Sequence, residues 1–208
     1  MPDLMARALL PLLILLALQQ LGSAGLIKAK AGLAPLMLAK AWEQSLASEG
    51  RPVKPWPWAD TWPVAKLQVP SMGISQFVLA GDTGNALAFG PGHNLASAAL
   101  GAAGPAMIGG HRDTHFQFLQ HLRKGQRIVL QLPDGLLRHY RVKQMTVDTA
   151  SGDMLWPNVG EQLLLVTCYP FDAFVTGGSE RFVVTAEPES LPLQTLDALG
   201  GEPQRILL

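Results

Sequence analysis

Residues 163–168 read Leu163-Leu164-Leu165-Val166-Thr167-Cys168. An unbroken apolar run of this length is typical of a β-strand that is buried on both faces. It ends at the only cysteine of the 208-residue chain, so this thiol has no partner for an internal disulfide. A lone cysteine is often a small, buried side chain without reactivity. The alternative is a nucleophile placed at the end of a strand.

Two other segments supply the groups that a cysteine nucleophile requires. A thiol with an ordinary pKa near ~8.5 is mostly protonated at neutral pH, so it needs an imidazole or a positive charge nearby. His111 follows two glycines, and Arg181 opens a further apolar segment. A histidine can protonate a leaving group, and an arginine can stabilise an oxyanion. We therefore predict that Cys168, His111 and Arg181 meet at three strand ends as catalytic residues.

The remaining soluble part of the chain also reads as strands. Most of the apolar segments are short, and Pro133-Asp134-Gly135 forms a hairpin turn between two of them. Strands are expected at residues 64–69, 76–80, 105–109, 127–132, 136–147, 163–168 and 181–187, and a short helix at residues 114–122. Many short strands joined by turns rich in glycine and proline favour a mainly β fold, a small closed β-barrel.

The same landmarks resemble those of the sortases, a family of membrane-anchored cysteine transpeptidases. Val166-Thr167-Cys168 is similar to the family's T-L-x-T-C signature, and Arg181 lies 13 positions later (181 − 168). His111 lies 57 positions before the cysteine (168 − 111), in a segment similar to the family's G-H-R. Residues 87–93 resemble the family's glycine-histidine loop, and residues 69–74 its first strand and turn. Several landmarks in one order are more specific than any single motif.

The resemblance covers residues 62–187, and the flanking segments look closest to the sortases of Gram-negative bacteria, often called class GN. This comparison rests on the tryptophan-rich residues 55–63 and on residues 168–173. Two positions depart from the family pattern. Leu164 stands where a threonine is usual and bears on how the cysteine strand packs. Gly104-Pro105 stands where a Gly-Asn pair is usual and bears on the loop that leads to His111.

The resemblance implies a closed sortase-type barrel of about eight strands with short helices. It also implies that Cys168 cleaves an L-P-x-T-G-like sorting motif near the C-terminus of a secreted partner protein. The product is a thioacyl-enzyme, which an acceptor amine resolves. In such a site we expect Thr167 to shape the substrate pocket and His93 to line the substrate cleft.

Two other functions remain open on the sequence. One is a hydrolytic cysteine peptidase on the same barrel, and the other is a non-enzymatic periplasmic binding module with an inert thiol. No cofactor or metal is expected, because His111 and His115 lack the glutamate of a helical zinc motif. Nucleic acid is not an expected partner, since 16 basic and 16 acidic residues leave no basic field to attract it.

The N-terminal segment has two interpretations. Residues 8–27 are mostly apolar, with Arg7 before them and Lys28 after, and their length of 20 (27 − 8 + 1) is enough to cross a bilayer. A cleaved signal peptide would use residues 8–18 as its apolar region. The resemblance favours a retained anchor, a single-pass transmembrane helix in the cell inner membrane. The catalytic domain would then lie on the periplasmic side.

Four segments are expected along the chain. They are the membrane anchor or signal peptide at 1–27, a juxtamembrane helix and Pro/Trp-rich linker at 28–60, the catalytic barrel at 61–188 and a C-terminal tail at 189–208. Residues 27–49 predict an amphipathic helix near the membrane surface, with an apolar stripe that includes Leu33, Leu36, Leu38 and Trp42. Prolines and tryptophans in residues 50–63 predict a stiff, extended linker.

Overall fold

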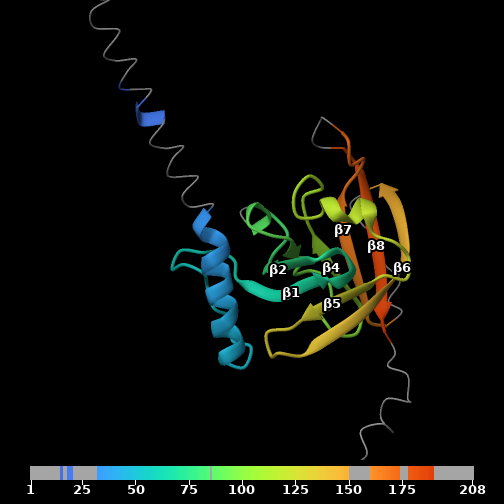
Figure 1. Cartoon of the computed structure of the whole chain (residues 1–208), viewed down its shortest axis with the longest axis horizontal. Coiled ribbons are helices and arrows are strands. Elements are labelled where there is room, and N and C mark those ends of the chain that lie inside the picture. Colours follow the sequence, from blue (N-terminus) through green and yellow to red (C-terminus); the bar gives the residue numbers. More distant parts are fainter. Residues whose placement is uncertain are drawn as a thin grey trace, which may run out of the picture.

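Eight strands close into a β-barrel (Figure 1). The computed structural model of the chain describes residues 15, 18–20, 32–84, 86–149, 160–173 and 178–189. Around the barrel the strands follow the order β1-β2-β3-β4-β7-β8-β6-β5. Their bounds are β1 Pro63–Val69, β2 Ile74–Ala80, β3 Gly92–His93, β4 Pro105–Gly109, β5 Arg127–Gln131, β6 Leu137–Thr149, β7 Gln162–Cys168 and β8 Glu180–Pro188. In the described residues between them, three 3-10 helices form: η1 Pro70–Met72, η2 Ala86–Ala88 and η3 Gln117–His121.

The predicted mainly β fold with a closed barrel of about eight strands is confirmed. All seven predicted strands form, and their ends differ from the prediction by at most two residues. Strand β3 was not predicted, because it is two residues long and carries no periodic pattern. This short strand bridges β2 and β4. Gly92 permits the approach, because a Cβ at this position would lie 2.0 Å from the carbonyl oxygen of Gly81.

β7 is central to the barrel, since it runs parallel to β4 on one side and antiparallel to β8 on the other. Leu163 and Leu165 belong to the main core inside the barrel. Leu164 and Val166 point to the opposite face, as alternate residues of a strand must, and pack there with Val183 of β8. The prediction of a strand buried on both faces is confirmed. Leu164, at a position where the sortase pattern has threonine, is thus part of an apolar cluster on the outer wall.

The short helix predicted at residues 114–122 forms over only part of that range. Only Gln117–His121 is helical, and it forms the 3-10 helix η3. Phe116, Leu119 and Leu122 are buried, and they follow one another at intervals of three residues. A 3-10 helix has three residues per turn, so it places these three side chains on one face toward the core.

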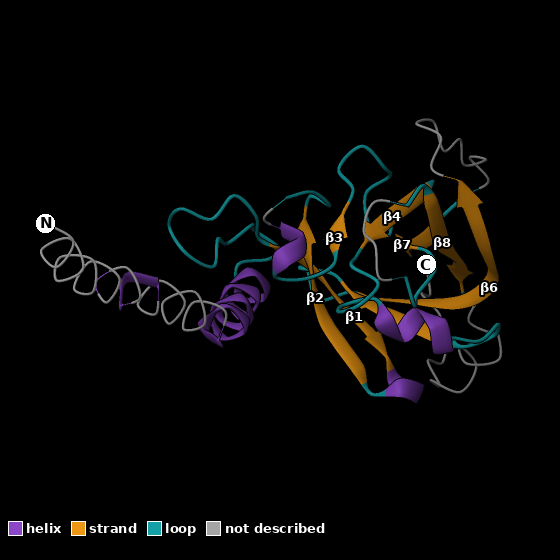
Figure 2. Ribbon diagram, turned by 90° about the horizontal axis from the view of Figure 1, so that it is seen from above, coloured by secondary structure: helices purple, strands orange, loops and turns teal. Residues whose placement is uncertain are grey.

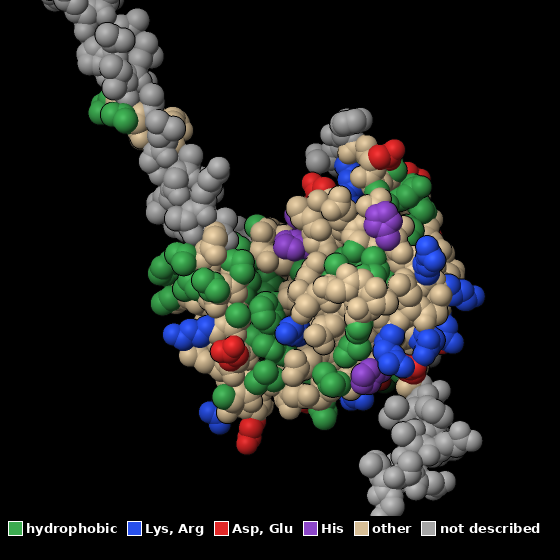
Figure 3. All heavy atoms as spheres, in the orientation of Figure 1, with side chains coloured by type: hydrophobic (Ala, Val, Ile, Leu, Met, Phe, Trp, Pro, Cys, Tyr) green, Lys and Arg blue, Asp and Glu red, His purple; other side chains and the backbone are tan. Residues whose placement is uncertain are grey.

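A longer helix at residues 32–47 lies outside the barrel beside β2 (Figure 2). Leu38 packs against Leu79 of β2, and the ring of Trp42 lies 6.1 Å from that of Phe77. The predicted apolar stripe is therefore divided between two faces. Leu38 and Trp42 are buried against the barrel, whereas Leu33 is 55% exposed and Leu36 is 68% exposed. Apolar side chains gather on the outer side of this helix (Figure 3).

The segment predicted to be an extended linker packs against the barrel. Pro55 and Ala59 are buried. The ring of Trp56 meets that of Phe89 edge to face, with centroids 5.2 Å apart. Thr61 donates a hydrogen bond from its hydroxyl to the carbonyl of Ala80, at 2.8 Å. These contacts fix the path by which the chain enters β1.

The two ends of the chain are described only in part. Most of residues 1–27, on which the membrane anchor was predicted, and residues 190–208 of the predicted tail lie outside the described residues. Within the part that the structure describes, no helix has both the length and the apolar character needed to span a membrane. Glu189 ends the described chain, and its carboxylate accepts a hydrogen bond from Arg127 on β5 at 2.8 Å.

The buried hydrogen bond of Tyr140 allows a test of how much a polar contact of the barrel interior stabilises the fold. Its side chain is 1% exposed, and its hydroxyl donates to a carboxylate oxygen of Glu161 at 2.6 Å. Burial, and then the hydrogen bond to Glu161, raise the pKa of Tyr140 far above its usual value. We expect Tyr140→Phe to lower the free energy of unfolding at pH 7 by about 1–2 kcal/mol, because a charge-assisted hydrogen bond is lost. Urea unfolding measures this difference.

The pH dependence of the same difference has a definite sign. In the unfolded chain Tyr140 ionises near pH ~10, whereas in the folded barrel it resists ionisation. The stability that its hydroxyl contributes is therefore complete below pH 10 and decreases above it. We expect the gap between the wild type and Tyr140→Phe to narrow above that pH. Tyr169→Phe is the control, and an equal loss in both variants would contradict the assignment.

Candidate active site

Cys168 and Arg181 face each other across neighbouring strands. Cys168 is the last residue of β7, and its register partner is Arg181, the second residue of β8. Directly opposed residues in an antiparallel pair place their side chains on the same face of the sheet. Cys168 shares the outer face with Leu164 and Val166, two and four residues before it. The thiol and the guanidinium therefore lie on the outer wall, and both residues are half-buried.

His111 reaches the same place from β4. Gly109 is the register partner of Val166, and the next residue, Gly110, donates its N–H to the carbonyl of Val166 at 3.1 Å. The hydroxyl of Thr167 donates in turn to the carbonyl of Gly110, at 2.7 Å. These two bonds fasten the residue before His111 to the two residues before Cys168. The three predicted catalytic residues are thus brought to neighbouring strand ends, at the top of the barrel in Figure 1.

Phe116 supports the turn around His111 through a backbone hydrogen bond and its buried ring. The N–H of Phe116 donates to the carbonyl of His111 at 2.9 Å, and the ring of Phe116 is fully buried. A Cβ on Gly110 would lie 2.7 Å from that ring. A glycine is therefore required before the histidine, because any larger residue would displace either the ring or the turn.

Burial distinguishes the two histidines of this turn. His111 is exposed, whereas His115 is half-buried and its carbonyl accepts a hydrogen bond from Gln76 at 2.9 Å. Burial lowers the pKa of His115, the nearby His111 lowers it further, and Asp113 partly opposes both effects. His115 is thus biased toward the neutral form beside an exposed imidazole.

Arg181 keeps its guanidinium close to the backbone that leads into β8. Its Nη1 donates to the carbonyl of Gly178 at 2.6 Å and to that of Glu180 at 2.9 Å. These bonds hold the side chain near the strand end without using all five of its N–H groups. Both bonds are made by Nη1, on the backbone that leads into the strand end opposite Cys168.

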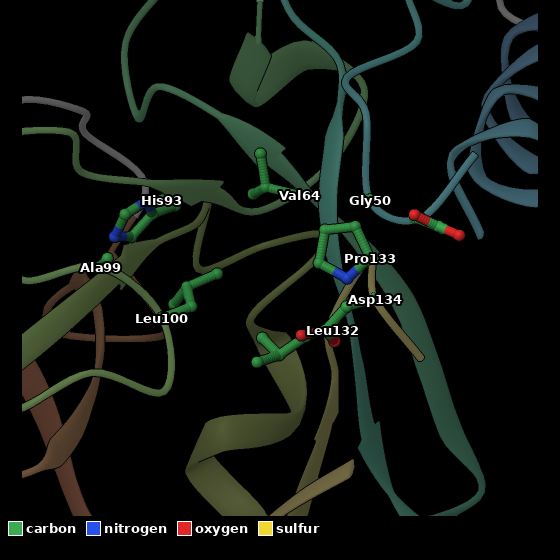
Figure 4. A pocket seen from close by; sticks show the side chains of 9 residues that line it. Gly50, Val64, His93, Ala99, Leu100, Leu132, Pro133 and Asp134 are labelled. Carbon is green, nitrogen blue, oxygen red and sulfur yellow. The ribbon is translucent and has the colours of Figure 1, made fainter. Parts of the chain in front are cut away.

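The two residues predicted to bind substrate are placed differently. Thr167 is 2% exposed, and its hydroxyl proton is used in the bond to Gly110. His93 is 8% exposed, and its Nε2 lies 2.9 Å from the carbonyl oxygen of Ala98. It lines a cavity of about 380 Å³ together with Val64, Leu100 and residues 132–134 of the β5–β6 turn (Figure 4). Cys168 is not among the residues that line this cavity, and substrate binding by Thr167 or His93 stays a prediction.

An aromatic cluster and an arginine, neither of them predicted from the sequence, lie beside the segment that follows the cysteine. The rings of Tyr169 and Phe182 stack with centroids 6.4 Å apart, and Phe171 meets Phe182 edge to face at 5.3 Å. Arg112 donates to the carbonyls of Pro170 at 3.0 Å and Ala173 at 2.7 Å. Arg112 directly follows His111 in the sequence motif, which could have drawn attention to it. The hydrogen-bond partners of Arg112, however, lie 58 and 61 residues further along the chain.

Nothing in the described residues forms a cluster of three or more acidic, histidine or cysteine side chains suited to a metal ion. The site therefore consists of a thiol, an imidazole and a guanidinium at the ends of β7, β4 and β8. These are the groups that an acyl transfer by a cysteine nucleophile requires.

Comparison with known proteins identifies the family. A family model described as the sortase domain matches residues 67–189, and the chain belongs to the sortase family. Sortase D of Bacillus subtilis (strain 168) is 29% identical over 119 residues, which cover 57% of this chain and 60% of that relative. The Gram-negative class that the flanking segments suggest stays a prediction.

Solved sortase structures share the fold. Sortase A from Corynebacterium diphtheriae aligns with a TM-score of 0.55 and 21% identity, over 80% of this chain and 88% of that one. A Clostridium perfringens Sortase D5 transpeptidase aligns with a TM-score of 0.56 and 19% identity, over 71% of this chain and 88% of that one. At these identities the likeness concerns the barrel architecture.

Replacing Gly110 tests the placement of His111. We expect Gly110→Ala to lower the free energy of unfolding by about 1–3 kcal/mol, because the new methyl group overlaps the buried ring of Phe116. Thermal unfolding measures this loss. Gly32→Ala is the matched control, since a Cβ at Gly32 has no neighbour within 4 Å. Equal melting temperatures for the two variants would show that the close contact with Phe116 is absent.

Proposed function

We propose that this protein is a cysteine transpeptidase that cleaves a sorting motif of a secreted protein and transfers the acyl part to an amine. The proposal is supported most directly by the register that places Cys168 opposite Arg181, with Gly110 fastened beside them. Sortase family membership supports the same chemistry. The motif is proposed to be L-P-x-T-G-like and to lie near the C-terminus of the partner.

The first half-reaction forms a thioester. The Cys168 thiolate attacks the carbonyl carbon of the threonine in the motif, and a tetrahedral oxyanion results. Arg181, at the strand end opposite the thiol, stabilises that negative charge. The C–N bond then breaks as protonated His111 gives its proton to the departing amine. The products are a thioacyl-enzyme, a free amine on the leaving peptide and neutral His111.

The second half-reaction reverses these roles. The acceptor amine attacks the thioester carbonyl, and His111 takes up the proton that the nitrogen loses. The C–S bond breaks, an amide forms and Cys168 leaves as the thiolate. Thiolate and imidazolium are thereby restored together, so the cycle needs no cofactor. Because His111 is exposed, the incoming amine can reach it from solvent.

The same exposure favours hydrolysis as the second candidate. Water can attack the thioester where the acceptor amine attacks, since neither Cys168 nor His111 is fully buried. The outcome is decided by competition between the amine and water for one intermediate. The peptidase and the transpeptidase therefore share the first half-reaction and differ only in the second.

The proposed location is the cell inner membrane, with the barrel on the periplasmic side. The apolar residues 8–27 support a single-pass anchor by their length. Leu33, Leu36 and Met37 support it further, because they are exposed at the start of the helix that follows. In this arrangement the barrel is held close to the surface from which secreted substrates emerge.

Loss of the thiol is the first test. The full chain is incubated with L-P-x-T-G-type peptides and a glycine-based amine, and the enzyme and products are weighed by mass spectrometry. We expect an acyl adduct on the wild type and an amine-ligated product, and neither with Cys168→Ala. An adduct released only by water would favour the hydrolase. Substantial turnover by Cys168→Ala would exclude the assignment of the nucleophile.

Arg181 is tested by its effect on rate. We expect Arg181→Ala to lower the rate of acylation by about 10²–10³-fold, as loss of an oxyanion donor does. Arg181→Lys should recover little of this, because an ammonium cannot reproduce the planar fork of a guanidinium. Full activity in the lysine variant would show that charge alone is sufficient.

A further inference from the structure

Three consecutive residues bracket the proposed nucleophile from the neighbouring strand. Gly110 is bonded to Val166 and Thr167, which precede Cys168. Arg112 is bonded to Pro170 and Ala173, which follow it. His111 is the residue between these two attachment points. Its position along β7 is therefore set from both sides.

The attachment after Cys168 is a side-chain clamp. Nη1 of Arg112 donates to the carbonyl of Pro170 at 3.0 Å, and Nη2 donates to that of Ala173 at 2.7 Å. The N–H of Ala173 donates back to Pro170 at 3.4 Å, so these residues form a turn. A guanidinium presents its donors in a fixed plane, and two carbonyls held at once also fix the orientation of the turn.

The other side of this turn is held by β8. Tyr169 donates its N–H to the carbonyl of Glu180 at 3.0 Å, and Phe171 packs edge to face against Phe182. These contacts fix the turn relative to Arg181. The clamp by Arg112 is what fixes it relative to His111. The segment after the cysteine thus spans both proposed partners of the thiol.

We propose that Arg112 is a positioning residue, which holds residues 169–173 and His111 in one geometry around Cys168. The inference rests on the proposed acyl transfer. Arg112 acts through the backbone carbonyls of Pro170 and Ala173. Proton transfer from His111 requires heavy-atom distances of about 2.6–3.2 Å, and a displacement of about 1 Å can cost about 10²-fold in rate. The clamp beside His111 therefore affects the rate of acylation by holding this geometry.

The test compares Arg112→Ala and Arg112→Lys with Arg123→Ala, a change at an exposed arginine before β5. Three quantities are measured on the full chain: the rate of acylation by peptide, the rate of Cys168 alkylation by iodoacetamide, and the melting temperature. We expect Arg112→Ala to lower kcat for acylation by about 10–10²-fold with little change in KM. Alkylation should stay within about twofold of the wild type, because it requires the thiolate but not the proton donor.

The lysine variant separates orientation from charge. Arg112→Lys should recover only part of kcat, since a single ammonium cannot hold both carbonyls in one plane. Arg123→Ala should behave as the wild type in all three measurements. Wild-type kcat in Arg112→Ala would overturn the proposal. A fall in kcat matched by faster alkylation and a lower melting temperature would overturn it as well, because it would show general loosening.

A readout without substrate keeps this inference distinct from the proposed function. If no peptide acylates the wild type, the proposed function fails, and amide hydrogen exchange then decides about the clamp. We expect exchange in residues 169–173 to be faster in Arg112→Ala than in Arg123→Ala. Equal exchange in the two variants would show that Arg112 does not hold the turn.

Discussion

The pairing of β7 with β4 and β8 is the constraint on which the rest of the site depends. A strand alternates its side chains between two faces, so the register of β7 decides which residues enter the core and which reach the wall. In the observed register Leu163 and Leu165 fill the interior, and Cys168 lies outside opposite Arg181. A shift of one residue would bury the thiol and expose the leucines. The apolar core therefore enforces the geometry of the chemistry.

Stability and reactivity are divided between the two faces of the same strands. The interior contains apolar side chains from seven of the strands together with Phe116. Hydrogen bonds near the strand ends, such as that from Thr167 to Gly110, connect this interior to the turn that carries His111. Because Thr167 points inward, its hydroxyl can fasten a neighbouring strand while the next residue faces solvent. Thr167 thus anchors the strand end, and the next residue is the proposed nucleophile.

The sequence predicts the parts of this arrangement that depend on local pattern or on general chemistry. The apolar run before Cys168 predicts its strand, and the needs of a thiol nucleophile single out His111 and Arg181. Contacts between distant loops carry no such pattern. The partners of Arg112 lie 58 and 61 residues away, and the two-residue β3 depends on a close approach to Gly81 that no local sequence indicates.

The helix at residues 32–47 shows a second limit. Its sequence predicts an apolar stripe, but not that one part of the stripe meets the barrel and another stays exposed. Leu38 has a partner in Leu79 only because the chain returns to place β2 beside the helix. Periodicity identifies the faces of a helix, whereas their neighbours follow from the complete fold. The complete fold likewise places His93, at a cavity that segments distant in the sequence line together.

The position of Cys168 on the outer wall has a consequence for what the protein can handle. A reactive group inside a barrel admits only molecules that fit the lumen. A group on the rim of the outer surface needs only a short extended peptide to lie against the wall, and the remainder of each polypeptide can stay in bulk solvent. In the proposed transfer reaction, cargo of any size and fold could thus be joined, provided that its tail is flexible and long enough to reach the strand ends.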